Sequence, residues 1–116
     1  MLVPAADIRL VLTTAGSSAE GERIAHALVD ERLAACVNLI PGLTSVYRWQ
    51  GTAETAGEIL LLIKTTAAEL EHVQEAVRRM HSYELPEFLV FTPGSASQPY
   101  LDWLIEQTGS PVQRRH

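Results

Sequence analysis

The segment from Glu58 to Lys64 constrains the fold more than any other part of the chain. Its interior residues, Ile59-Leu60-Leu61-Leu62-Ile63, are all apolar. Side chains alternate between the two faces of a β-strand, so a strand that is apolar at every position requires burial on both faces. A fold that contains this segment as a strand therefore has to supply cover for two faces of its sheet.

Length and composition indicate one globular domain over residues 1–116. The chain is 47% hydrophobic and 20% charged, and it is long enough to bury a core without metal or disulfide support. No apolar run approaches the length of a membrane span, and no basic segment precedes an apolar one at the N-terminus. Because the single cysteine, Cys36, cannot form an internal disulfide, we expect a soluble protein of the reducing cytoplasm.

The net charge of −5 and its distribution indicate which kinds of binding partner to expect. Lys64 is the single lysine, and the arginines are scattered rather than gathered in a basic stripe. Nucleic acid and anionic membrane are therefore not expected as partners, whereas cations or small ligands fit better.

Local patterns in the first part of the chain predict two long strands after an initial strand and helix. A Ser17/Glu20 capping box should begin the helix, and Pro41-Gly42 should interrupt the second strand with a bulge. In order, we expect a strand over 8–13, a helix from Ser17 to about Arg32, a strand from Cys36 to Trp49, a turn at Gln50-Gly51, and a partner strand reaching Lys64 with an irregularity near Gly57.

The second part predicts a helix, a short strand and a last helix. The elements are a helix behind a Thr66/Glu69 capping box that ends near His81, a strand from Phe88 to Phe91, and a helix capped by Ser97-Gln98-Pro99, with frayed ends at Met1–Ala6 and Gly109–His116. The order β-α-β-β-α-β plus a helix is that of an α+β, ferredoxin-like split βαβ fold, with two helices on one face of an antiparallel sheet. Another copy of the chain or the third helix should cover the other face.

Blocks of sequence in a fixed order resemble the CutA family, the divalent-cation-tolerance proteins, from Ile8 to about Ile105. The blocks are Leu33-Ala34-Ala35-Cys36 with Ile40-Pro41-Gly42, Ser45 with Tyr47, Trp49 and Gly51, Leu62-Ile63-Lys64-Thr65, His81 with Tyr83, Pro86 and Glu87, and Tyr100-Leu101 with Trp103-Leu104. The resemblance implies a tight homotrimer in which long hairpin strands pair across subunits. It also implies a role in tolerance of copper and other divalent cations, an architecture like that of the PII signalling proteins, and no established catalytic reaction.

The resemblance makes His81 and Met80 the candidate metal ligands. Some family members carry a cysteine where this chain has Thr13, and His-His where it has Met80-His81. One imidazole per subunit makes at best a weak site unless a threefold axis or another group supplies more donors, so we expect no obligatory cofactor, with copper or another divalent cation as the candidate ion. The alternative is a tight Cu(I) site in which Met80 adds its thioether. Packing is the favoured role for Met80, which continues an apolar stripe, and His81 could equally interact with its helix C-terminus.

Aromatic and charged residues near the strand ends are candidates for a ligand cleft or an intersubunit contact. They are Tyr47, Trp49, Glu58, Lys64, Tyr83, Glu84, Glu87 and Trp103. Contact between subunits is favoured for the two tryptophans, because aromatic side chains bury large areas with few rotatable bonds. An ion pair of Lys64 with Glu87 or Glu58 is also expected, and structural pairing is favoured over chemistry.

The usual sequence signatures of catalysis are missing, so an enzyme is not expected. The chain has no nucleophile elbow, no phosphate-binding glycine loop, no Cys-x-x-Cys and no helical pair of histidines. Two function classes remain. The first is a trimeric, non-catalytic protein of copper and divalent-cation tolerance or response to metal ions, and the second is a PII-like small-molecule sensor or regulatory adaptor that uses the intersubunit cleft.

Overall fold

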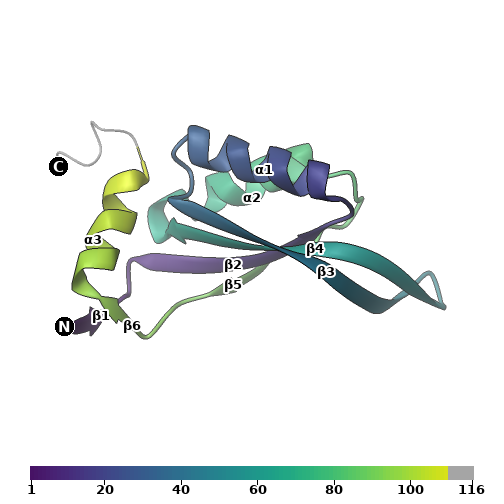
Figure 1. Ribbon diagram of the computed structural model, residues 1–116, viewed down its shortest axis with the longest axis horizontal. Helices are drawn as coiled ribbons and strands as arrows, with labels where there is room; N and C mark the ends of the chain where they lie inside the picture. The colour runs from purple at the N-terminus through teal and green to yellow at the C-terminus, as the bar shows by residue number, and fades with distance from the viewer. Residues whose placement is uncertain (110–116) are drawn as a thin grey trace.

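Four antiparallel strands form the central sheet, in the order β3-β4-β2-β5. They are β2 (Ile8–Ala15), β3 (Cys36–Trp49), β4 (Thr52–Thr66) and β5 (Leu89–Phe91). The computed structural model describes residues 1–109. Two helices, α1 (Ser18–Asp30) and α2 (Leu70–Met80), lie side by side on one face of this sheet (Figure 1). The predicted α+β arrangement, β-α-β-β-α-β followed by a helix, is confirmed.

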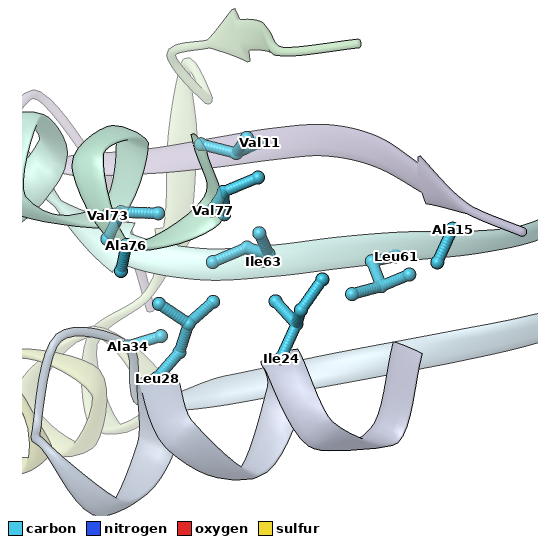
Figure 2. Close-up of a cluster of buried hydrophobic side chains, with 10 residues drawn as sticks. All are labelled: Val11, Ala15, Ile24, Leu28, Ala34, Leu61, Ile63, Val73, Ala76 and Val77. Atoms are coloured by element: carbon cyan, nitrogen blue, oxygen red, sulfur yellow. The ribbon is translucent and has the colours of Figure 1, made fainter. Parts of the chain in front are cut away.

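The main hydrophobic core lies between the sheet and the two helices, and we call this side of the sheet the helix face. Leu61 and Ile63 of β4 are fully buried there, and Figure 2 shows them beside Ile24 and Leu28 of α1. From α2, Val73, Ala76 and Val77 complete the contact. Their three- and four-residue spacing places them on one side of the helix, so burial of this stripe fixes how α2 lies on the sheet.

The opposite side, which we call the open face, is covered less completely. Leu60 and Leu62 of β4 point to it and are half-buried. Larger exposed fractions are found at Ile40 (43%), Leu89 (52%) and Phe91 (49%), whose strand partners place them on the same face. Helices α1 and α2 thus cover the helix face, whereas α3 (Gln98–Gln107) covers the open face only at the end near Ile8 and Lys64.

The third helix packs at one end of the sheet. Helix α3 (Gln98–Gln107) follows β6 (Ser95–Ser97), which pairs with β1 (Leu2–Pro4) in a separate two-stranded sheet (Figure 1). A second core cluster forms here from Ala5, Ile8, Leu101 and Leu104. Within residues 1–109, no helix is long and apolar enough to cross a membrane.

The hairpin of β3 and β4 projects beyond the two helices (Figure 1). Its turn lies at Gln50-Gly51, with φ angles of 51° and 83° that fit a two-residue hairpin turn. The register shifts between Ile40 and Leu43, where Gly42 has a φ of 80°. Both the predicted turn and the predicted bulge at Pro41-Gly42 are confirmed, because glycine adopts positive φ at little steric cost.

Three local predictions are wrong. Residues 1–6 are not frayed, because β1 pairs with β6, and Gly57 lies in regular register opposite Thr44. Thr66 makes no side-chain cap bond, since a 3₁₀ turn, η1 (Ala67–Glu69), precedes α2. Ser97 is the N-cap residue of α3 and Pro99 lies in its first turn, as predicted, although the Ser97 hydroxyl makes no cap bond. Each error followed from a local motif whose residues the tertiary pairing uses differently.

The end of the first predicted helix and the start of the predicted frayed C-terminus also shift. Helix α1 ends at Asp30, and Arg32 then adopts a positive φ of 61° and donates side-chain hydrogen bonds to the backbone oxygens of Glu106 and Gly109. Gly109 is thereby tied to the loop after α1 rather than frayed. The remainder of the predicted frayed end, residues 110–116, lies outside the described residues.

Candidate ligand cleft

A cleft of about 700 Å³ lies between the projecting hairpin and the loop that joins α2 to β5. Its volume is within the range of small-molecule sites in proteins. The structure brings six of the predicted residues together in its lining, which consists of Thr14, Ser45, Val46, Tyr47, Trp49, Glu58, Tyr83, Glu84, Leu85, Pro86 and Glu87.

The bulge at Pro41-Gly42 determines which hairpin side chains share a face with Glu58. Directly opposed residues of antiparallel strands point to the same side of a sheet. Before the bulge, Ile40 opposes Leu60, and after it Leu43 opposes Glu58, so the strand gains one residue. This extra residue shifts the alternation and places Tyr47 and Trp49 on the open face, the face of Glu58.

The loop that forms the other wall is anchored by Glu20, the third residue of α1. The Glu20 carboxylate accepts hydrogen bonds from the backbone N–H groups of Ser82 (3.0 Å) and Gly16 (3.4 Å). Burial alone would raise the pKa of this carboxyl, but these hydrogen bonds and nearby His81 outweigh burial and lower the pKa. The Thr13 hydroxyl adds a second anchor by donating to the backbone oxygen of Glu87.

His81 lies buried under this loop, with its side chain fully covered. The Tyr83 N–H donates to Nδ1 of His81 (3.0 Å), so the hydrogen-bond network assigns the proton to Nε2, which donates to the backbone oxygen of Thr14 (2.6 Å). Both ring nitrogens are thus used within the protein. In this arrangement His81 acts as a link between β2 and the loop.

Tyr83 connects the loop to the sheet across the cleft. Its hydroxyl donates to Oε2 of Glu58 at 2.8 Å, and its ring stacks at a tilt on His81 with centroids 4.6 Å apart. Gly16 allows this approach, since a Cβ at that position would lie 3.1 Å from the Tyr83 hydroxyl. Burial, the bond to Glu58 and the Glu58 charge raise the pKa of Tyr83 to about 12.

The donors that the sequence offered for a metal do not fit a tight site in this arrangement. His81 has neither ring nitrogen free, and the Met80 side chain packs against the main core. Within residues 1–109, no group of three or more His, Cys, Asp or Glu side chains could hold a metal ion. The favoured packing role for Met80 agrees with the structure.

Two predicted residues, Lys64 and Trp103, lie outside the cleft lining. The Lys64 ammonium is 5.7 Å from the centre of the Tyr100 ring, and Tyr100 in turn lies against Trp103 with ring centroids 5.5 Å apart. The expected ion pair of Lys64 with Glu87 or Glu58 is wrong: among the described residues Lys64 forms none, because α3 brings an aromatic face to it.

The sequence did not identify the residues that hold the cleft in shape. Glu20 was recognised only as part of a capping box, and Thr13 only as a departure from a ligand pattern. In the structure, both stabilise the loop through bonds across 62 and 74 positions of the chain. No local pattern encodes such pairs.

Comparison with known proteins agrees with the fold. Residues 9–107 match the family model described as CutA1 divalent ion tolerance protein. The Divalent-cation tolerance protein CutA of Thermus thermophilus is 48% identical over 86% of this chain and 97% of its own length. The solved CutA of Synechococcus elongatus is 40% identical with a TM-score of 0.90, covering 94% of this chain and 96% of that one. A solved periplasmic divalent cation tolerance protein CutA of Archaeoglobus fulgidus is 35% identical with a TM-score of 0.84, covering 86% and 97%. This chain therefore belongs to the CutA1 family of divalent ion tolerance proteins.

Proposed function

We propose that this chain forms a homotrimer that acts in tolerance of, or response to, divalent cations including copper, and that it does so without catalysing a reaction. Family membership supports the cation role, since the Thermus relative is named for divalent-cation tolerance. The observation that carries the assembly is the incompletely covered open face, where large apolar side chains remain exposed.

Assembly into a trimer follows from how little of the open face one chain covers. The exposed residues Ile40, Leu89 and Phe91 lie on β3 and β5, the two edge strands of the sheet, whose unpaired backbone groups can bond to another copy. Light scattering at low micromolar concentration should give three times the 12.8 kDa mass of one chain. A monomer at that concentration would rule out this part of the proposal.

Metal binding is expected to be weak. Calorimetric titrations with Cu(I), Cu(II) and Zn(II) near pH 6 and near pH 8 should show low affinity that depends on imidazole protonation. His81→Ala tests the candidate ligand, and His26→Ala removes an exposed histidine of α1 as the matched control. Nanomolar affinity that survives His81→Ala would contradict a site at Met80 and His81.

The second candidate function is that of a PII-like small-molecule sensor or regulatory adaptor. The cleft favours it, because it combines a suitable volume with polar and aromatic side chains that point into the same space. In a trimer this cleft would lie at the boundary between copies. Differential scanning of the trimer with a panel of small ligands would test it, since a ligand that binds the folded state raises the midpoint of unfolding.

The proposal also includes a cytoplasmic location for the protein. A single, partly buried cysteine, Cys36, is compatible with reducing conditions in the cytoplasm. The Archaeoglobus relative is described as periplasmic, so the fold itself does not determine the compartment. Fractionation of cells that express the chain at its natural level would test the cytoplasmic location.

A further inference from the structure

The charged groups around the cleft have one sign. Its lining contains three carboxylates, those of Glu58, Glu84 and Glu87, and neither a lysine nor an arginine. Lys64, the single lysine of the chain, lies outside the cleft against the ring of Tyr100. Carboxylates in a concave space raise the local concentration of positively charged ligands, because the low-dielectric walls focus their field.

Aromatic rings share this space. In a single chain, Tyr47 and Trp49 are 45% and 37% exposed although they are large apolar groups, and Tyr83 forms part of the opposite wall, so in the proposed trimer these rings would line a cleft at the boundary between copies. The faces of such rings carry negative partial charge and attract cations, most strongly for tryptophan. A simple inorganic cation gains little from apolar rings, whereas an alkylated ammonium is attracted to the ring faces and also buries its methyl groups against them.

Glu58 has the geometry to act as the counter-ion. The Tyr83 hydroxyl bonds Oε2 of Glu58 and so fixes the carboxylate at the wall, while Oε1 accepts no hydrogen bond from residues 1–109. Burial first, and then the bond to Glu58 and the Glu58 charge, raise the pKa of Tyr83 to about 12, so the phenol stays neutral and keeps donating to Glu58 near neutral pH.

We propose that the cleft binds a small organic cation of the alkylammonium class, with the ammonium methyl groups against Trp49 and Tyr47 and the charge opposite Glu58. This inference rests on the second function proposed above, the small-molecule sensor, and names the class of ligand. It is independent of the weak metal site and of any catalytic step.

Two tryptophans allow the site to be observed directly. The chain has two, and Trp103 lies outside the cleft. In Trp103→Phe, fluorescence reports on Trp49 alone, and in Trp49→Phe it reports on Trp103 alone. The assembled protein is titrated with choline and with 3,3-dimethyl-1-butanol, called dimethylbutanol below. This neutral molecule has nearly the same shape as choline, because a carbon atom replaces the ammonium nitrogen.

Choline should change the fluorescence of Trp103→Phe and should bind at least about fivefold more tightly than dimethylbutanol, because the shape is shared and the charge is not. Added to Trp103→Phe, Glu58→Gln should reduce choline affinity by about fivefold or more and leave dimethylbutanol unaffected. Glu75→Gln, which removes a carboxylate from the exposed side of α2, is the matched control and should change neither.

The outcomes separate the two proposals. Equal binding of choline and dimethylbutanol would overturn the cation class while leaving a small-molecule cleft. Binding of choline that is unaffected by Glu58→Gln, or that is reported by Trp103 in Trp49→Phe, would overturn the location. Failure of both probes to bind Trp103→Phe would overturn the inference, and the ligand panel described above would then decide alone whether the cleft binds small molecules of another class.

Discussion

The two faces of the central sheet carry similar apolar residues but reach very different burial. On the helix face, Leu61 and Ile63 are fully covered by α1 and α2. On the open face, their neighbours Leu60 and Leu62 are half-buried, and Leu89 is 52% exposed. An apolar pattern thus records that a face must be covered, but it does not record whether the cover comes from the same chain. The cover of the helix face comes from the same chain, and under the proposed trimer another copy covers the open face.

The largest expected effect tests the helix face. Leu61→Asp would place a carboxylate among Ile24, Leu28 and the other side chains of the main core, with no partner for its charge. We expect the free energy of unfolding to fall by more than about 5 kcal/mol, which is comparable to the total stability of a small domain. Circular dichroism should show an unfolded chain or the protein should be insoluble. A folded trimer would show that the helix face is not the core.

The neighbouring residue tests the open face. Leu62→Asp points away from α1 and α2, so the core of the monomer stays intact and the contact between copies is lost. Light scattering should fall from the mass of three chains to that of one, with helical circular dichroism retained. Leu62→Ala, which removes volume without adding charge, should remain a trimer at micromolar concentration. If Leu62→Asp also remains a trimer, another surface forms the interface.

The sequence predicted the features that a few adjacent residues determine. The bulge at Pro41-Gly42 and the turn at Gln50-Gly51 depend on local φ preferences, and the doubly apolar strand depends on side-chain alternation. Prediction from the sequence failed where the contacts of a side chain depend on a residue far away along the chain. His81 bonds the backbone of Thr14, 67 positions away, so a candidate metal ligand is a buried link. The cleft residues were found as a group, and their anchors were not.

A smaller effect is expected where α1 anchors the wall of the cleft. Glu20→Gln keeps one acceptor oxygen but cannot accept from both Gly16 and Ser82, so stability should fall by about 1–2 kcal/mol near neutral pH. The pKa of Glu20 is lower in the folded protein, so its stabilisation is present above about pH 4.5 and is lost as pH falls through the folded pKa.

Urea unfolding of wild type and Glu20→Gln from about pH 7 to pH 3 would measure how the stabilisation by Glu20 depends on pH. The difference between wild type and Glu20→Gln should narrow below about pH 4.5, and Glu22→Gln, at an exposed position of the same helix, should behave as wild type does. A constant difference across this range would show that the charge of Glu20 contributes nothing to the anchor.

The smallest effect concerns the bond that spans the cleft from the loop to the open face. Tyr83→Phe removes the hydroxyl that donates to Glu58, and the side chain is only partly buried, so stability near neutral pH should fall by about 1 kcal/mol or less. The pKa of Tyr83 is raised to about 12 from about 10, so the neutral phenol stabilises the folded state below about pH 10 and that contribution is lost as pH rises toward 12. Wild type should therefore lose stability over this alkaline range in urea unfolding, and Tyr83→Phe should lose less. Glu58→Gln keeps an acceptor but removes the charge, so it should reduce the alkaline loss in part. An identical alkaline loss in wild type and Tyr83→Phe would show that the Tyr83 hydroxyl is not held by Glu58, and that the loop is held by the bonds of Thr13, Glu20 and His81 alone.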